Sequence, residues 1–437
     1  MQRLSCPVDV QLELSEGCNF RCRHCYNYWR YSSDCKKNEL SKSQFLRVVG
    51  VLNDCGVSAI TLTGGEPLLR QDVVFAVLKE AKRLGMEVGL NSNATLITAD
   101  IARRLKCEGL DHALCSLLGK EETHDFITCS KNGFSRAKAG IENLVMAGIP
   151  VAVNMVVSQL NKGEVTHVGE LVGAMGAKTF CATPMVPSHA SNRSLALSGD
   201  ECKQALRDLM WAGKTLGLNF DTLEPVARCL FSGAEEDEFL YFFGNRICSA
   251  AVTSCAISSL GMVRPCIHAD VSFGNILQEN FSSIWTKMSP WSEESILPQE
   301  CLDCAATAIC EGGCRMSSKM VSGRYNGKDM YMSEPIIDKA RVVKLPIRER
   351  KETAPSADER LLMNSSARLR AENFGGIAYV GNKIEFLSAS GFELVRLMVR
   401  RKEFTPIDIA KEAGFAVDVV VLVAAKLLRS KILTKGR

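Results

Sequence analysis

In the first half of the chain, segments in which hydrophobic residues alternate as in a strand take turns with segments in which they are spaced as in a helix. Val10, Leu12 and Leu14 alternate with polar residues, which predicts a strand with one buried face. The composition predicts further strands at residues 59–63, 87–91, 113–117, 151–157 and 178–182. Six strands are therefore expected before the middle of the chain.

Segments with helical spacing separate these strands. In residues 72–85, apolar side chains from Val74 to Ala81 recur at i, i+3, i+4 and i+7, and Gly85 is a helix stop. Residues 134–148 show the same behaviour. Repeated βα units predict a parallel sheet, either doubly wound or an open barrel, with ligands at the carboxyl ends of its strands.

The pattern changes in the second half. Residues 248–332 are irregular and rich in Cys and Gly, with too few apolar positions for a core of their own, which predicts a module held together by metal. Residues 336–362 are charged and predict a solvated linker.

The end of the chain predicts a hairpin followed by helices. Residues 376–380 and 383–387 flank Gly381-Asn382, a pair typical of a two-residue β-turn. Helices are predicted from Ser388, from Thr405 and across Val421 to Leu428. The sequence therefore predicts a small winged-helix-like unit.

Composition narrows the class of protein. The chain has 437 residues, 46% of them hydrophobic, which suits two to four domains at ~150 residues each and excludes a disordered protein. The net charge is only +4 and is spread along the chain, which disfavours nucleic acid as a partner. No apolar stretch approaches the ~18 residues of a membrane span, and the N-terminus has no apolar signal segment, so we expect a cytoplasmic protein with no membrane partner. In that compartment, 19 cysteines indicate metal ligation or redox chemistry.

The first cysteine cluster lies in a loop directly after the first predicted strand. Cys18, Cys22 and Cys25 can hold three corners of a four-iron cluster and leave one iron open. A zinc site completed by His24, or chance clustering of buried cysteines, is the alternative. The second strand ends in Thr-Gly-Gly-Glu-Pro at residues 63–67, where the glycines let backbone approach a ligand closely.

These two motifs together resemble the signatures of the radical S-adenosylmethionine (SAM) superfamily, a Cys-x3-Cys-x-aromatic-Cys loop and a Gly-Gly-Glu-Pro strand end. The resemblance covers roughly the first half of the chain and implies an α/β fold with a partial (β/α)6 TIM barrel. It also implies a 4Fe-4S cluster whose open iron is chelated by SAM, and one-electron cleavage of SAM to a 5′-deoxyadenosyl radical. His24 takes the aromatic position expected near the adenine.

The same resemblance implies contacts with the rest of SAM. Gly64, Gly65 and Glu66 would meet the methionyl amine. Ser92-Asn93 resembles the Thr-Asn-Gly segment at the end of the third strand, with alanine where glycine is usual.

Later strands offer further candidates. Ser116 matches a serine that contacts SAM from the fourth strand, although Leu118 replaces the Asp of that version. Asn154 on the fifth strand is a candidate to face the cofactor. His124-Asp125 matches a family dipeptide but is more typical of a helix-start or loop contact.

A second set of cysteines lies in the irregular module: Cys248, Cys255, Cys266, Cys301, Cys304, Cys310 and Cys314. Seven thiols are nearly enough for two more four-thiolate sites, with zinc ribbons as the alternative. The remaining cysteines are predicted to be mostly buried small hydrophobes; they include Cys6, Cys35, Cys55, Cys107, Cys115, Cys129, Cys181 and Cys202.

The module resembles the SPASM domain, the auxiliary-cluster extension of radical SAM enzymes that modify peptides. The likeness assigns Cys248, Cys255, Cys266 and Cys314 to a first auxiliary cluster, and the other three cysteines, at residues 301, 304 and 310, to a second. Where the family has its last cysteine, residues 329–332 read Asp-Met-Tyr-Met. The second cluster could therefore keep an open iron, be completed by Asp329 or an upstream cysteine such as Cys229, or be absent.

Residues 367–437 resemble the RiPP recognition element, a winged-helix fold that binds leader peptides of ribosomally made precursors. Such a unit adds the peptide as a strand to a sheet edge. A DNA-binding winged helix is the alternative, but residues 416–422 are acidic and then apolar where a recognition helix is basic and polar.

These expectations combine into a peptide-modifying radical SAM maturase that forms a thioether or carbon–carbon crosslink. Its partners would be a precursor peptide and an electron donor such as flavodoxin or ferredoxin. A sulfatase-activating or haem-pathway maturase, and a non-catalytic iron–sulfur redox sensor, are the other hypotheses. The expected domains are a radical SAM core (1–232), a SPASM domain (233–335), a linker (336–362) and a leader-binding unit (363–437).

Overall fold

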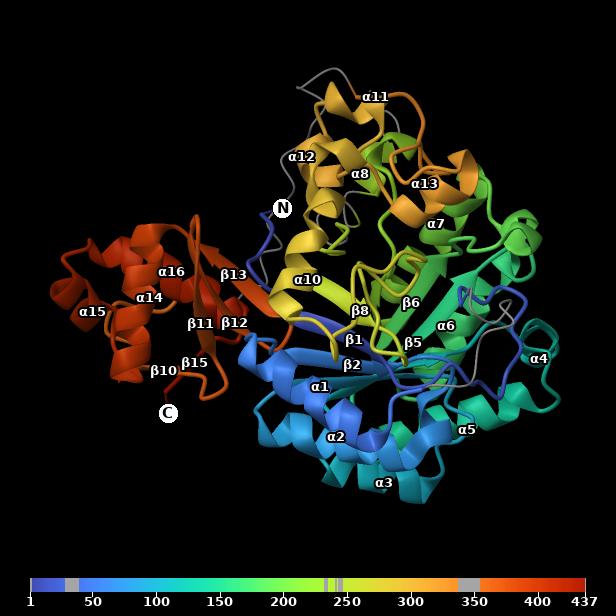
Figure 1. Cartoon of the computed structure of the whole chain (residues 1–437), viewed down its shortest axis with the longest axis horizontal. Coiled ribbons are helices and arrows are strands. Elements are labelled where there is room, and N and C mark those ends of the chain that lie inside the picture. The colour runs from blue at the N-terminus through green and yellow to red at the C-terminus, as the bar shows by residue number, and fades with distance from the viewer. Residues whose placement is uncertain are drawn as a thin grey trace.

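The computed structural model describes residues 2–27, 39–231, 235–239, 242, 247–336 and 354–436. Figure 1 shows a large α/β body and a smaller C-terminal unit beside it along the longest axis of the molecule. Each part has its own hydrophobic core, the second made by residues from Leu361 onward.

The body is built on a sheet in which the six predicted strands are parallel and follow chain order. They are β1 (Asp9–Glu13), β2 (Ala59–Thr63), β3 (Glu87–Ser92), β4 (His112–Ser116), β5 (Val151–Val157) and β6 (Thr179–Pro184). Three more strands extend the sheet: β7 (Asn219–Asp221) beside β6, and β8 (Ser254–Ile257) and β9 (Val263–Arg264) beyond β1. Because β7 and β9 end the sheet without pairing with each other, the barrel is open, which confirms the predicted fold class.

Helices cover the outer face of this sheet (Figure 1). They are α1 (Lys42–Asp54), α2 (Gln71–Arg83), α3 (Ala99–Cys107), α4 (Glu121–Thr128), α5 (Gly133–Met146), α6 (Val165–Ala174) and α7 (Gly199–Leu216). In α2 the buried residues include Val74, Val77, Leu78 and Ala81, the positions that the spacing predicts. Gly85 follows α2 with a φ of +73°, a left-handed conformation that favours glycine.

Strand β1 shows how the alternating pattern positions the site. Val10 and Leu12 belong to the core of the body. Because neighbouring side chains point to opposite faces of a strand, Asp9, Gln11 and Glu13 face the inside of the barrel. Strand β1 therefore contributes polar side chains to the inside of the barrel, and Asp9 and Gln11 line its cavity.

The cysteine-rich module continues the barrel sheet. Strand β8 pairs in parallel with β1, where Asp9 lies opposite Ser254, and β9 pairs antiparallel with β8. The other elements near and within the module are short, as the sequence predicts: α8 (Glu235–Glu238), α10 (Phe281–Lys287), α11 (Gln299–Leu302), α12 (Thr307–Cys310) and α13 (Arg315–Ser322). No helix among the described residues is long and apolar enough to span a bilayer.

The C-terminal unit contains two three-stranded sheets and three helices. Its elements are β10 (Leu361–Met363), β11 (Arg368–Glu372), β12 (Gly375–Val380), β13 (Lys383–Leu387), α14 (Ala389–Arg401), β14 (Glu403–Phe404), α15 (Pro406–Ala413), α16 (Val417–Arg429) and β15 (Leu433–Lys435). The predicted hairpin is β12–β13, and Ser388 and Thr405 cap α14 and α15. Most of the predicted linker, residues 337–353, lies outside the described residues. Its predicted end at residue 362 falls within β10, because Leu361 is fully buried in the C-terminal core.

The sheet β11–β12–β13 docks the C-terminal unit on the body at the amino ends of the barrel strands. Tyr379 Oη donates to Gly56 O over 2.9 Å, and Ser58 Oγ donates to Gly381 O over 2.5 Å. Ile377 and Tyr379 also share a small hydrophobic cluster with Leu4 of the N-terminal segment. The β12–β13 turn thus lies at the end of the barrel opposite the loop that carries the first cysteine cluster.

Candidate active site

One large cavity runs through the barrel and contains about 3860 Å³ of space not filled by protein atoms, part of it open to solvent. Most of the predicted site residues line it: Cys18, Cys22, His24, Cys25, Gly64, Gly65, Ser92, Asn93, Ser116, Asn154, Cys248, Cys255, Cys266 and Cys314. The fold therefore brings the first cysteine cluster and four cysteines of the second set to a single cavity. The predicted set outside it is Glu66, Cys301, Cys304 and Cys310.

The loop after β1 presents the first three cysteines to the cavity. The Arg23 backbone N–H donates to Ile127 O over 2.9 Å, so the loop is held against the end of α4. The Phe20 N–H donates to Cys18 Sγ over 3.3 Å. A backbone donor aimed at a sulfur stabilises the thiolate form, which is the form that binds iron.

Gly64 and Gly65 hold the end of β2 against this loop. The Gly65 N–H donates to Ser15 O over 2.6 Å, and the Glu66 N–H donates to Gly17 O over 2.7 Å. A Cβ on Gly64 would collide with Ser15 O, and one on Gly65 would collide with Gly17 O. The glycines therefore let two backbone segments approach each other closely. The sequence pattern predicts only a close approach of backbone to a ligand.

Glu66 has its carboxylate turned away from the cavity. The side chain is fully buried, and its oxygens accept from Ser92 Oγ at 2.9 Å, the Asn93 N–H at 2.8 Å and the Leu68 N–H at 3.1 Å. Burial raises the pKa of Glu66 to about 7, although all three hydrogen bonds oppose the rise. Glu66 thus joins the ends of β2 and β3 and positions Asn93, whose amide lies 3.9 Å from Cys18 Sγ.

The candidates on later strands differ in character. Asn154 lines the cavity, and its side-chain oxygen accepts from Thr183 Oγ1 at 2.8 Å. His124 is fully buried, its Nδ1 accepts from the Leu118 N–H at 3.1 Å, and burial lowers its pKa to about 4. Asp125 accepts from the Phe134 N–H at 2.7 Å. His124 and Asp125 therefore each make a structural contact with the backbone of a neighbouring segment.

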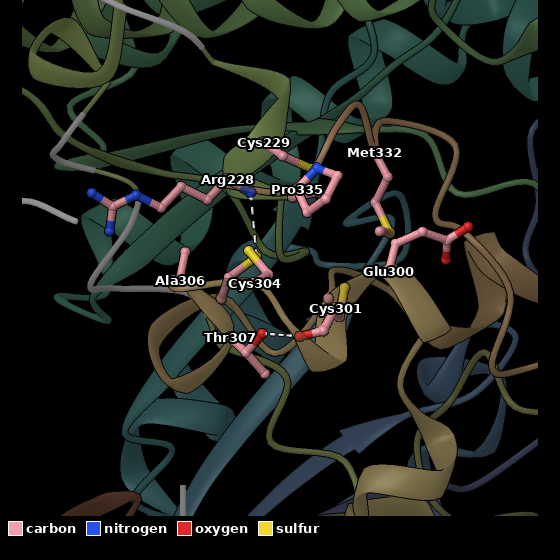
Figure 2. A pocket seen from close by; sticks show the side chains of 12 residues that line it. Arg228, Cys229, Glu300, Cys301, Cys304, Ala306, Thr307, Met332 and Pro335 are labelled. Atoms are coloured by element: carbon pink, nitrogen blue, oxygen red, sulfur yellow. Dashed lines mark hydrogen bonds between the residues drawn. The ribbon is translucent and has the colours of Figure 1, made fainter. Parts of the chain in front are cut away.

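The seven cysteines of the auxiliary module fall into two places. Cys248, Cys255, Cys266 and Cys314 line the main cavity, whereas Cys301, Cys304 and Cys310 line a separate pocket together with Cys229 (Figure 2). This division follows the two ligand sets that the SPASM likeness implies. Within the described part of the chain, no three His, Cys, Asp or Glu side chains are arranged to hold a single metal ion.

The donors of the main cavity fit a thiolate-bound cluster. Burial raises the pKa of Cys248 to about 11 and that of Cys266 to about 12, so both are neutral thiols before a metal binds. Metal binding must then release their protons.

The remaining cysteines, predicted to be mostly buried, include two that are exposed. Cys107 and Cys129 are exposed because they lie at the ends of α3 and α4, whereas Cys115 and Cys202 are buried as predicted. Cys35 lies outside the described residues.

Comparison with known proteins decides the family. The model of the radical SAM superfamily matches residues 12–172, and that of SPASM, an iron–sulfur cluster-binding domain, matches residues 248–305. The chain belongs to the radical SAM superfamily. This radical SAM enzyme uses SAM and 4Fe-4S clusters as cofactors, and its SPASM domain supplies the auxiliary cluster site.

Individual relatives differ in their reactions. The chain is 28% identical to the AdoMet-dependent heme synthase of Methanosarcina barkeri over 74% of this chain and 96% of that protein. It is 25% identical to the PqqA peptide cyclase of Rhizobium meliloti over 80% of this chain and 90% of that protein. Among solved structures, Streptococcus suis SuiB bound to precursor peptide SuiA gives a TM-score of 0.60 at 17% identity, covering 75% of this chain and 76% of that chain. At that identity the likeness shows the fold alone.

Replacing Glu66 by glutamine is expected to weaken SAM binding about tenfold, the usual cost of losing an outer hydrogen-bond partner of a metal site. The new amide would place a donor opposite the Asn93 N–H, which now donates to Glu66 Oε2. Equilibrium dialysis with SAM under anaerobic conditions measures the change, and the iron content should stay constant. Glu80→Gln on the surface of α2 is the control, and equal SAM affinity in both variants would contradict the positioning role.

Proposed function

We propose that this radical SAM enzyme oxidatively modifies a ribosomally made precursor peptide, forming a thioether or carbon–carbon crosslink, and binds the leader of that peptide on its C-terminal unit. The bound cofactors would supply one-electron chemistry that ends in hydrogen abstraction from the substrate. Cys18, Cys22 and Cys25 would hold the cluster that binds SAM.

The other site residues would bind and orient the cofactors. Gly64, Gly65, Asn93 and Ser116 would contact SAM from the strand ends, and His24 would lie near its adenine. The four cysteines of the second set that line the main cavity would hold the first auxiliary cluster. A flavodoxin or ferredoxin would supply electrons, and a reducing cytoplasm would keep the thiolates available.

The proposal of a leader-binding unit rests on the free edge of β13. In the described part of the chain, β13 pairs with β12 alone. Val380 and Lys383 flank the two-residue turn and form a hydrogen-bonded pair, so the alternate residues Ile384 and Phe386 direct their backbone N–H and C=O groups to the free edge. An extended peptide can use these groups as an added strand.

Exposed apolar side chains accompany this edge. Phe386 on β13 is 38% exposed, and Val419 and Leu422 on α16 are 40% and 65% exposed. Only the carboxyl end of α16 is tied to β13, where Ser430 donates to the Glu385 carboxylate, and Val419 and Leu422 lie nearer the amino end of that helix. Apolar residues of a leader paired with β13 would pack against Phe386, and a continuation of the leader over α16 would pack against Val419 and Leu422.

A haem-pathway precursor is the second candidate substrate, and the likeness to AdoMet-dependent heme synthase favours it. An iron porphyrin carries carboxylates, which bind best to cationic side chains. Among the described residues that line the cavity, the only Lys and Arg are Lys178 and Arg315. Arg315 already donates to the carbonyls of Gly312, Ile296 and Tyr325, and Lys178 lies before β6 at the amino end of the barrel. The cavity therefore suits a peptide better than a porphyrin.

Replacing Leu422 by glutamate is expected to weaken leader binding about tenfold or more, because an exposed apolar contact becomes a charge. The probe is a synthetic peptide encoded by a short reading frame beside the gene, and fluorescence anisotropy measures its affinity. Cleavage of SAM without peptide should be unchanged. Met146→Glu, at a 75% exposed position on α5 of the body, is the matched control.

The opposite results are equally informative. Equal peptide affinities of both variants would contradict binding at α16. Conversion of an iron porphyrin by the reduced enzyme with SAM, with no change in the mass of the peptide, would replace the first proposal by the second.

A further inference from the structure

The second auxiliary site lacks one cysteine by comparison with the SPASM pattern, since no cysteine follows Cys314. Three thiolates would leave one iron of a four-iron cluster open, which decides whether the site binds a ligand or only carries electrons. The residues around Cys301, Cys304 and Cys310 show how this chain completes the set.

We infer that Cys229 is the fourth ligand of a second auxiliary 4Fe-4S cluster. Cys229 lies in the short 3-10 turn Arg228–Leu230, about seventy residues before the other three thiols, and lines the same pocket as all of them. The pocket contains about 330 Å³ of space not filled by protein atoms, part of it open to solvent. Figure 2 shows Cys229 across the pocket from Cys301 and Cys304.

Backbone donors point at the sulfurs from both sides. The Arg228 N–H donates to Cys310 Sγ over 3.3 Å, and the Ser333 N–H donates to Cys229 Sγ over 3.3 Å. Such bonds to sulfur are among the means by which proteins tune iron–sulfur clusters. Cys229 and Cys310 therefore lie in surroundings that favour bound thiolates.

The segment that carries the last cysteine in the SPASM pattern reaches this pocket without a thiol. Met332 and Pro335 line the pocket, and Ser333 between them bonds to Cys229 through both its N–H and its hydroxyl. Cys229 thus provides a thiolate at the place in the pocket that this segment contacts.

Oxygen ligands fit the pocket less well. The Asp329 carboxylate accepts from the Cys314 N–H at 3.1 Å and the Tyr331 N–H at 2.8 Å, and Asp329 does not line the pocket. Glu300 lines it, but its carboxylate pairs with Lys328 at 3.5 Å and points away from the sulfurs of Cys229 and Cys304 in Figure 2. A set of four thiolates leaves no iron open, so this cluster serves electron transfer rather than substrate binding.

The test uses the full chain with Cys18, Cys22 and Cys25 replaced by alanine, so that only auxiliary clusters remain. After anaerobic reconstitution this parent should hold about eight irons per chain. Adding Cys229→Ala should halve that content or leave a three-iron cluster with a new electron paramagnetic resonance (EPR) signal. Cys301→Ala should also lose one cluster, and Cys107→Ala on the surface should lose nothing.

Several outcomes would overturn the inference. The first is an unchanged iron content and EPR spectrum in Cys229→Ala. The second is a parent that holds only about four irons per chain, or zinc. The third is a change of the EPR spectrum in Asp329→Asn without one in Cys229→Ala. Where the alanine variant does not fold, Cys229→Ser retains a side chain that can bind iron through oxygen. A shifted EPR spectrum of that variant supports the inference, and an unshifted one overturns it.

Discussion

Replacing Cys22 by alanine is expected to abolish the cleavage of SAM to 5′-deoxyadenosine. Cys22 lines the main cavity between Cys18 and Cys25, in a loop anchored to α4 on one side and to the end of β2 on the other. Two thiolates cannot retain a four-iron cluster with one open iron, so about four irons per chain should also be lost. Liquid chromatography of the nucleoside products and iron analysis measure the two effects.

A matched cysteine separates this effect from the loss of any thiol. Cys107 is exposed at the end of α3 and lines neither cavity, so Cys107→Ala should keep full activity and iron content. Production of 5′-deoxyadenosine by Cys22→Ala at the wild-type rate would contradict the cluster assignment. Zinc instead of iron in the wild-type loop would contradict it as well.

The barrel could be predicted from the sequence because its strands and helices have clear periods. The strands at residues 59–63 and 151–157 have the predicted bounds, and apolar spacing identifies the buried face of α2. Strands β7 to β9 were not predicted because each has only two to four residues, too few to show a period. Their pairing depends on β1 and β6, which no local pattern encodes.

The site could be predicted where spacing along the chain implies proximity, or where a family motif marks the end of a strand. Cys18, Cys22 and Cys25 share one loop, so their motif identifies them without a structure. Cys229 is far from Cys301 in sequence, and only the fold brings it to the same pocket. The orientation of the Glu66 carboxylate also depends on β3 and could not be read from its motif.

The two ends of the barrel have different tasks in this arrangement. The carboxyl ends of the strands carry the cysteine loop and the contacts proposed for SAM, whereas the amino ends receive the C-terminal unit. Asn382, in the β12–β13 turn, lines the main cavity from that end. A leader peptide added to β13 would therefore lie on a hairpin that also borders the cavity, which gives leader binding a direct route to affect the substrate site.

Replacing Arg264 by leucine is expected to destabilise the junction between the barrel and the auxiliary module by about 3–5 kcal/mol, the usual cost of removing one partner of a buried ion pair. Arg264 on β9 bonds to Glu13 on β1, and both side chains are 2% exposed. The pair joins β1 to β9 across β8, the strand that carries Cys255. Arg264 lies two residues before Cys266. Urea unfolding followed by the fluorescence of Trp285 and Trp291, both buried in this module, measures the loss.

The effect should depend on pH with a definite sign. Burial raises the pKa of Glu13 to about 7, and the positive charge of Arg264 opposes the rise. Without Arg264 the folded pKa should rise further, so the folded variant keeps a proton that the unfolded chain releases above about pH 4.5. Its deficit relative to the wild type should therefore stay constant below about pH 7 and grow above it, where folded wild-type Glu13 loses its proton and the variant keeps it. The double variant Glu13→Leu/Arg264→Leu buries no charge at this site and should recover most of the lost stability. If the double variant is as unstable as Arg264→Leu at pH 8, packing rather than charge determines the loss.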